Sequence, residues 1–326
     1  MNKKNKNLFL LIISENIKSK RIVKVNNQER LFNYFEIKGN PGFVNINLKS
    51  DNELFLSPRL IMNSDTEIAN TMKVVLTHFW SNAFSYIKSG DKAGLKLFLS
   101  KINEPRETRT GFANKSIDGN SIGTTLIDSF VESIFQLKVN QRYLISDFSN
   151  LELFLPGVNV DRISDMTISI LKDILIKYTI ENSVGINKSK FTKSKLKNVF
   201  DVNSNSWLDK DALLPVYNGI PVIFLPKNLL RKKSGVNCTL RSFYCFGIVN
   251  DIINDASYKE LAIPTGKNGN YLLSDIKLVF SCTKFNILTL GLRKLNSLID
   301  FNQVHNKRLK SLTDEDIESI ISKSGK

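Results

Sequence analysis

Four carboxylate residues in the first half of the chain have the types and the spacing that metal chemistry requires. Asp161 and Asp165 lie four residues apart in the run DRISD at 161–165, a spacing that places two side chains on one side of a helix. Glu104 and Glu107 stand in the run EPRE at 104–107. Carboxylate oxygens suit Mg²⁺, which also keeps water and substrate phosphates in its shell. We therefore predict Glu104, Glu107, Asp161 and Asp165 as catalytic residues, with Asp161 and Asp165 as ligands of Mg²⁺.

A structural role for the same acids is the competing interpretation. Carboxylates in the first turn of a helix cap free amides and complement the helix dipole. The nearby cations Arg106, Arg109 and Arg162 would then pair with them in salt bridges. The spacing also differs from known nuclease motifs, in particular from a strand-borne acid followed by Glu-x-Lys. Catalysis and structural support therefore both stay open at this point.

The chain contains few histidine and cysteine residues, so catalysis or metal binding by these residue types is not expected. The chain holds only His78 and His305, so Ser-His-Asp, Cys-His and multi-histidine metal sites are disfavoured. Cys238, Cys245 and Cys282 are spaced too irregularly for a disulfide framework or a zinc knuckle. We predict that they are reduced core residues, which suits a cytoplasmic location.

The chain carries a formal net charge of +15, which favours polyanions as partners through counterion release. Basic residues gather around Phe191 and Phe200, and again after Pro226. The predicted nucleic-acid-binding residues are Lys190, Lys193, Lys195, Lys197, Arg231, Lys232 and Lys233. The alternative is that the first run is a solvated linker and that an AT-rich genome accounts for part of the lysine excess.

A strand-turn-helix is predicted to position the two aspartates. The segment LELFL at 151–155 has the composition of a buried strand, and Pro156 and Gly157 supply a turn before the helix. Apolar residues then recur at helical spacing. They are Ile163, Met166, Ile170, Ile174 and Tyr178. This helix is expected to pack against the core of the first domain.

The remaining elements of the first half are strands followed by helices. Residues 30–61 are expected to form strands, with a hairpin turn at 50–52, and helices are expected at 65–88, 91–102 and 124–137. The loop at 110–123 contains Gly111, Gly119 and Gly123 before a helix N-terminus, a geometry that can hold phosphate. It lacks the Gly-Lys-Ser/Thr of a P-loop, so a plain surface loop is the alternative.

The composition predicts an α+β protein of two domains. A mixed domain with the strand-turn-helix core spans 1–186, a basic linker spans 187–206, and a smaller domain spans 207–326. The smaller domain opens with a β-hairpin around Asn218 and Gly219, the dipeptide that best fits a type I′ turn. Helices are expected to follow at 240–254, 274–281, 285–301 and 313–322.

No apolar run in the sequence approaches the roughly 20 residues that cross a bilayer, so no membrane association is predicted. The N-terminus imitates a secretory signal because lysines precede an apolar stretch at 8–13. That stretch is short and no small-residue cleavage site follows it, so we interpret it as a first strand or a short helix.

Several segments together resemble a family of bacterial proteins associated with phage-defence and restriction loci. The resemblance covers most of the chain in order, at 54–61, 102–123, 151–167 and 213–231. The motifs that support it most strongly are EPRE at 104–107 and DRISD at 161–165. This sequence departs from the family at Ser57, where relatives carry an acid before the proline. The resemblance implies a defence context with partner proteins.

These observations predict a bacterial antiphage-defence protein that contacts nucleic acid, DNA or RNA, with Mg²⁺-dependent nuclease activity as the enzyme hypothesis. The alternative is a non-catalytic adaptor or binding subunit of a multi-protein defence complex, in which the acids belong to a core hydrogen-bond network. A third hypothesis is a scaffold that does not contact nucleic acid.

Overall fold

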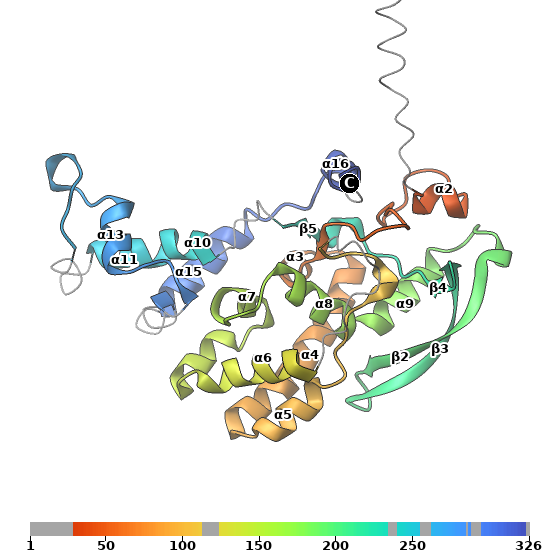
Figure 1. Cartoon of the computed structure of the whole chain (residues 1–326), viewed down its shortest axis with the longest axis horizontal. Helices are drawn as coiled ribbons and strands as arrows, with labels where there is room; N and C mark the ends of the chain where they lie inside the picture. Colours follow the sequence, from red (N-terminus) through yellow and green to blue (C-terminus); the bar gives the residue numbers. More distant parts are fainter. Residues whose placement is uncertain are drawn as a thin grey trace, which may run out of the picture.

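The structure, a computed structural model, describes residues 29–112, 124–233, 240–254, 262–284, 286–287 and 295–323 (Figure 1). Helices dominate, and the described strands form two small antiparallel sheets of order β1-β5 and β2-β3-β4. The predicted α+β class is confirmed. The N-terminal stretch at 8–13, predicted as a first strand or a short helix, and most of the glycine-rich loop, from 113 to 123, lie outside the described residues.

The first part of the chain contributes short elements and three longer helices. They are α2 (Leu31–Phe35), β1 (Leu54–Leu56), α3 (Pro58–Asn63), α4 (Glu67–Ser89), α5 (Lys92–Leu99), the 3₁₀ turn η1 (Arg106–Thr108) and α6 (Thr124–Gln136). The helices predicted at 65–88, 91–102 and 124–137 are thus confirmed. Helix α4 ends at Gly90, whose φ of +78° is the left-handed conformation that commonly terminates a helix.

The middle of the chain supplies the central helices and most of the strands. They are α7 (Leu151–Phe154), α8 (Val160–Ile170), α9 (Lys172–Glu181), β2 (Phe191–Asp201), β3 (Ser206–Tyr217), β4 (Ile220–Pro221) and β5 (Leu230–Lys232). Short 3₁₀ turns connect them. These turns are η2 (Val139–Ile145), η3 (Phe148–Asn150), η4 (Lys188–Lys190) and η5 (Lys227–Leu229).

The last part of the chain is helical, as predicted. It contains α10 (Leu240–Phe243), the π-helical turn η6 (Tyr244–Ile248), α11 (Val249–Asn254), the turn η7 (Lys267–Gly269), α13 (Leu273–Val279), α15 (Leu295–Asn306) and α16 (Asp314–Ile321). The first of these helices form a group beside the main body, and α16 returns to lie near α2 and β5 (Figure 1). Within the described residues, no helix is both long and apolar enough to cross a membrane.

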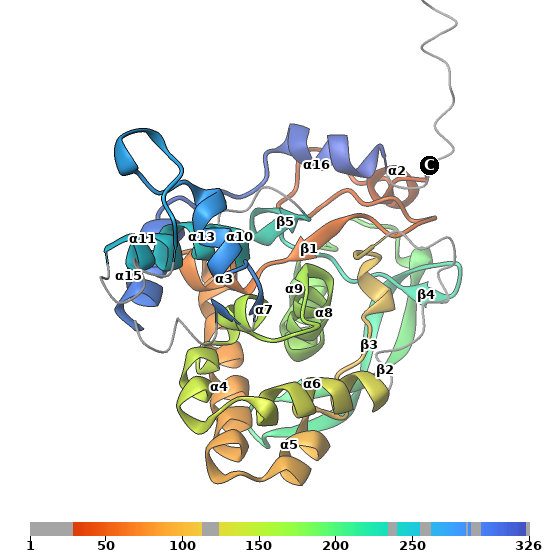
Figure 2. The same cartoon turned by 60° about the vertical axis from the view of Figure 1, so that its left-hand side comes forward.

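Helix α8 lies at the centre of the molecule, surrounded by α4, α6, β1 and the β2–β3 hairpin (Figure 2). All of its residues except Asp161 and Arg162 are buried. Because neighbours cover every side, its polar side chains need partners inside the protein. Ser164 Oγ accepts a hydrogen bond from the Leu56 amide at 2.9 Å, which fixes β1 against the helix.

The predicted strand at 151–155 is wrong, because these residues form α7 and its C-terminal end. A short apolar run does not distinguish a buried strand from a buried helical turn. Leu151, Leu153 and Phe154 are all buried, as the apolar run required, but the preceding turn η3 continues into a helix.

The predicted hairpin within 30–61 is also wrong. Residues 31–35 form α2, and β1 pairs with the distant β5, with Phe55 opposite Arg231. Arg231 lies 176 positions beyond Phe55 in the chain, so local turn signals at 50–52 could not indicate this pairing.

The segment predicted as a basic linker contains β2, an ordered strand that pairs with β3 from Phe191 to Asp201. Its lysines are exposed, whereas Leu196, Val199 and Phe200 are buried. Successive side chains of a strand point to opposite faces, so a sequence that is polar on average can still have one face in the core. The segment predicted as a linker thus contains an ordered strand at Phe191–Asp201. Whether 1–186 and 207–326 are separate domains stays a prediction.

The predicted hairpin around Asn218 and Gly219 is confirmed. The two residues have φ of +50° and +80°, and they join β3 to β4 with Tyr217 opposite Ile220. Pro221 shortens β4, because proline has no amide proton for a further strand bond.

Truncation of Phe200 tests the assignment of β2 to the core. Its ring lies 4.9 Å from the ring of Phe79 and 5.4 Å from that of Trp207, centroid to centroid. We expect Phe200→Ala to lower the free energy of unfolding by about 3–5 kcal/mol in urea denaturation, because it leaves a cavity. The matched change Lys197→Ala, at an exposed position of the same strand, should alter it by less than about 0.5 kcal/mol. Equal, small effects would contradict a buried strand.

Candidate functional site

A strap formed by residues 104–112 joins two acidic segments that are far apart in the sequence. The carbonyl oxygen of Arg109 accepts hydrogen bonds from Asn52, from the backbone amide at 2.9 Å and from Nδ2 at 2.8 Å. The Gly111 amide donates to the Asn52 carbonyl oxygen at 2.9 Å. These bonds fix the turn that carries Asp51 against the strap.

The other end of the strap reaches the first turn of α8. The backbone amide of Phe112 donates to Asp161 Oδ1 at 3.2 Å. Gly111 makes this approach possible, since its φ is +135° and a Cβ there would stand 3.0 Å from the same oxygen. The strap therefore brings Asp51 and Asp161 to one region of the molecule.

Four carboxyl groups of this region influence one another electrostatically, and we refer to Asp51, Glu104, Asp161 and Asp165 as the carboxylate cluster. Burial, followed by the charges of Asp161, Glu104 and Asp51, raises the pKa of Asp165 to about 9. Burial, followed by the charge of Glu104, raises the pKa of Asp51 to about 6, with a smaller contribution from Asp161. The charges of Glu104 and Asp161 thus disfavour ionisation of both Asp51 and Asp165.

The two other members of the cluster are shifted in the same direction. Burial raises the pKa of Glu104, and the charge of Asp161 adds to the shift while Arg106 opposes it. Burial also raises the pKa of Asp161, opposed by the Phe112 amide and by the charge of Arg162. The cluster as a whole therefore lacks the positive charge that would hold four carboxylates ionised.

Asp165 is the most isolated of these acids. Its residue is 8 % exposed. Among the residues that the structure describes, none donates a hydrogen bond to its carboxyl group. A buried carboxylate without donors is costly, so at neutral pH this group must hold a proton or meet a cation.

Arg109 is the cation that acts on Asp51. Burial raises the pKa of Asp51, and the positive charge of Arg109 opposes this shift. The residue is 2 % exposed, and its Nη1 donates to the Leu48 carbonyl oxygen at 2.8 Å. Its guanidinium carbon lies 5.1 Å from the centroid of the Tyr217 ring. Within the described part of the chain, Nε and Nη2 of Arg109 have no hydrogen-bond partner.

The structure places Glu107 outside the carboxylate cluster, in contrast to its predicted catalytic role. Glu107 Oε1 forms an ion pair with Lys172 Nζ at 2.9 Å, and Lys172 is 1 % exposed. The Glu107 carbonyl oxygen accepts from the Ile223 amide at 2.9 Å. This residue therefore anchors the strap to α9 and to the segment after β4, which is a structural use of the acid.

Asp51 is the site residue that the sequence did not reveal. In the sequence Asp51 lies between Ser50 and Asn52, a pattern typical of an ordinary turn. Its neighbours in the cluster are 53 and 110 positions away, so only the contacts of the strap bring them together. No local signal distinguishes it from a turn aspartate.

The donor chemistry of the cluster fits a hard divalent cation, although its geometry does not form a complete set of ligands. Over the described residues, no group of three or more His, Cys, Asp and Glu side chains is arranged to hold a metal ion. Mg²⁺ commonly takes one or two carboxylates and completes its shell with water and substrate phosphates. Asp161 and Asp165 could supply such a pair.

The predicted nucleic-acid residues on the β2–β3 hairpin face carboxylates. Lys193 pairs with Asp211 at 3.1 Å, and Lys195 pairs with Asp209 at 3.5 Å. The exposed Lys197 follows them on the same strand. Alternating charges across the two strands reduce the positive potential that the sequence alone suggested.

The remaining predicted cations lie in three different settings. Lys190 Nζ lies 4.7 Å from the centroid of the Tyr34 ring. Arg231, which is buried, pairs with Glu152 at 2.8 Å, and Lys232 pairs with Asp316 at 3.5 Å. Lys233 is exposed and holds its Nζ 4.5 Å from the centroid of the Phe112 ring.

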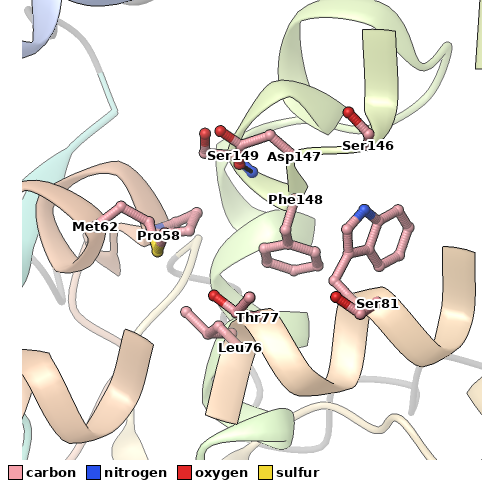
Figure 3. A pocket seen from close by; sticks show the side chains of 10 residues that line it. Pro58, Met62, Leu76, Thr77, Ser81, Ser146, Asp147, Phe148 and Ser149 are labelled. Carbon is pink, nitrogen blue, oxygen red and sulfur yellow. Dashed lines mark hydrogen bonds between the residues drawn. The ribbon is translucent and has the colours of Figure 1, made fainter. Parts of the chain in front are cut away.

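A separate pocket of about 210 Å³ opens between α3, α4 and the turn at 146–149 (Figure 3). Leu76, Phe148 and Met62 give it an apolar lining, and Asp147 is its charged residue. The Asp147 side chain already accepts the Ser149 amide at 2.8 Å as a helix cap. No member of the carboxylate cluster lines this pocket, so the two features are distinct.

The fold and site define an α+β protein built around a buried helix and a cluster of carboxyl groups. The chain belongs to the family described as domain of unknown function DUF8370, whose model matches residues 34–237. None of the curated proteins and none of the solved structures matched the chain. The matched region contains the strap, the whole carboxylate cluster and β5, and it ends before α10. The resemblance to phage-defence proteins stays a prediction.

The pH dependence of the stability of an Asp165→Asn variant tests the raised pKa of the Asp165 carboxyl group. The pKa of Asp165 is about 9 in the folded protein and 3.8 in its ordinary range, so the folded state retains a proton that the unfolded chain releases. Wild-type stability should therefore fall, relative to the variant, as the pH rises between these two values. The expected divergence is about 1.4 kcal/mol for each pH unit, measured by urea denaturation in EDTA from pH 5 to pH 8.

The control for this measurement is Asp209→Asn, which removes an exposed charge from β3. Its unfolding free energy should follow the wild type with a constant offset across the same pH range. Parallel curves for wild type and Asp165→Asn would show that Asp165 is ionised without penalty.

Proposed function

We propose that this chain binds Mg²⁺ at the carboxylate cluster and cleaves phosphodiester bonds in nucleic acid, in the bacterial antiphage-defence context that its resemblance implies. The observation that carries the proposal is Asp165, a buried acid without a described hydrogen-bond donor, beside three further carboxyl groups. A site of this composition is stabilised by a cation more than by any uncharged ligand.

The residues of the cluster take different parts in this proposal. Asp161 is oriented by the Phe112 amide, and Asp165 lies one helical turn further along α8, so the two side chains form the cation-binding pair. Glu104 adds negative charge near the pair, since its charge raises the pKa of Asp165, and this charge would favour a bound cation. When bound, the cation would polarise the phosphoryl oxygen and lower the pKa of a water molecule.

Asp51 is suited to accept a proton in the reaction. With a pKa of about 6 it is largely ionised at neutral pH yet retains basicity, as an efficient general base requires. Arg109 limits the upward shift of this pKa and fixes the turn that carries the acid. These two residues would therefore set the pH at which activity rises.

The overall charge supports nucleic acid as the substrate class. A net charge of +15 attracts polyanions, and four of the 31 acidic residues act together in the carboxylate cluster. A basic protein with a local acidic site is the arrangement that a cation-dependent phosphodiesterase needs. A cytoplasmic location and partner proteins of a defence complex belong to the same proposal.

Calorimetry and a cleavage assay test the cation site together. Titration of the protein with Mn²⁺ at pH 7 should show binding with release of protons, seen as different heats in buffers of different ionisation enthalpy. Labelled DNA and RNA, single-stranded and duplex, should be cleaved with Mg²⁺ or Mn²⁺ and not with EDTA. Asp161→Asn and Asp165→Asn should each reduce cleavage by about a hundredfold or more, because they remove cation ligands.

Asp209→Asn serves as the matched control, since it removes one carboxylate outside the cluster. It should bind Mn²⁺ and cleave as the wild type does. Absence of Mn²⁺ binding by a folded wild-type protein would overturn the proposal, and folding is checked by circular dichroism.

A non-catalytic adaptor is the second candidate, and the C-terminal helices favour it. Ile263 and Leu278 are 81 % and 87 % exposed, and Leu272 is 47 % exposed. These apolar side chains lie beyond residue 237, where the family match ends. Such residues suit contact with a partner protein. An adaptor predicts no cleavage with any cation and oligonucleotide binding that EDTA does not change.

A further inference from the structure

Most of the cations that the sequence assigned to nucleic-acid contact are held by acids of the same chain. Lys190, Lys193, Lys195, Arg231 and Lys232 each form an ion pair with a carboxylate at 3.5 Å or less. Within the described residues, Lys197 and Lys233 have no carboxylate partner. These two side chains are the members of the predicted set whose charge is not locally cancelled.

Lys233 differs from Lys197 in its link to the carboxylate cluster. Its Nζ lies 4.5 Å from the centroid of the Phe112 ring, and the backbone amide of Phe112 donates to Asp161. The Phe112 ring is fixed against Phe55 of β1, with centroids 5.3 Å apart. One residue thus connects the ammonium group to a proposed cation ligand.

The position of Lys233 in the fold is set by strand pairing. Arg231 of β5 stands opposite Phe55 of β1, and the chain continues through Lys232 to Lys233 at the exposed end of this ladder. The pairing places Lys233 beside the Phe112 ring, which packs on the same Phe55. A cation over an aromatic face is held without using its N–H donors in conventional hydrogen bonds.

Lys233 is linked to the carboxylate cluster through Phe112 and not through an ion pair. Among the described residues, it forms no ion pair with Asp51, Glu104, Asp161 or Asp165, while the Phe112 ring beneath it belongs to the residue whose amide contacts Asp161. An incoming polyanion, which the ionised acids of the cluster would repel, meets positive charge beside Phe112.

We propose that Lys233, supported by the Phe112 ring, binds a backbone phosphate of the nucleic-acid strand whose neighbouring phosphodiester lies at the carboxylate cluster. The cleavage part of this inference rests on the proposed function, whereas the phosphate contact is measurable without cleavage. Lysine acts here as a point charge with three donors, so it recognises the backbone and carries no base preference.

The experiment measures binding of a fluorescein-labelled single-stranded oligodeoxynucleotide by anisotropy, with Ca²⁺ in place of Mg²⁺, over a series of salt concentrations. Lys233→Met should weaken binding about fivefold near 0.1 M salt, and should reduce the slope of log K against log salt by about 0.7, because one phosphate contact is lost. Lys233→Arg, which retains the charge, should restore most of the affinity.

The charge-matched control is Lys88→Met, in the exposed last turn of α4. It lowers the net charge by the same amount and should leave both the affinity and the salt slope close to the wild type. Equal effects of Lys233→Met and Lys88→Met would overturn the inference, since only overall charge would then matter. Absence of oligonucleotide binding by the wild-type protein would overturn it as well.

Mn²⁺ calorimetry separates this inference from the proposed function. Lys233→Met should bind Mn²⁺ as the wild type does, since its ammonium group is not a cation ligand. If the wild type fails to bind Mn²⁺ while Lys233→Met still loses affinity and salt slope, the proposed function fails and the phosphate contact stands. If Mn²⁺ binds and Lys233→Met changes neither quantity, the reverse holds.

Discussion

The burial of α8, complete except at Asp161 and Arg162, is the constraint on which the rest of the structure depends. A helix covered in this way must give its polar side chains partners inside the protein. Ser164 accepts a hydrogen bond from the Leu56 amide, which fixes β1 against the helix. Asp161 accepts a hydrogen bond from the Phe112 amide, which fixes the strap. Asp165 has no described donor. The need of buried polar groups for hydrogen-bond partners thus positions the neighbours of α8. It leaves Asp165 as the acid that requires a proton or a cation.

The carboxylate cluster combines two effects that are rarely tolerated together, burial and like charge. Both favour the protonated form of the acids, which explains why the pKa of Asp165 rises so far above that of an exposed aspartate. Arg109 counteracts the effect only at Asp51, because its guanidinium group is directed to Leu48, Tyr217 and the Asp51 turn. An imbalance of this kind is characteristic of sites that bind a charged ligand.

The distribution of positive charge is more restricted than the net charge of the chain suggests. Ion pairs along β2 and β3 and at Arg231 cancel much of the cationic sequence locally. Local pairing leaves the overall excess in place, so long-range attraction to a polyanion persists although most of the predicted binding residues are paired with acids. Lys233 has no acid partner among the described residues, and β-strand pairing rather than sequence proximity brings it beside Phe112.

The sequence by itself determined the α+β class, the helices α4, α5 and α6, the Asn218-Gly219 turn, and the spacing that places Asp161 and Asp165 on one helix. These features depend on residues within a few positions of one another, where helical periodicity and turn chemistry act directly. Only the tertiary structure decided that 151–154 is a helix, that β2 replaces a linker, that Asp51 joins the cluster and that Glu107 leaves it for Lys172. Those outcomes follow from burial and pairing between segments far apart in the chain, and local sequence does not record which distant surface a segment will meet.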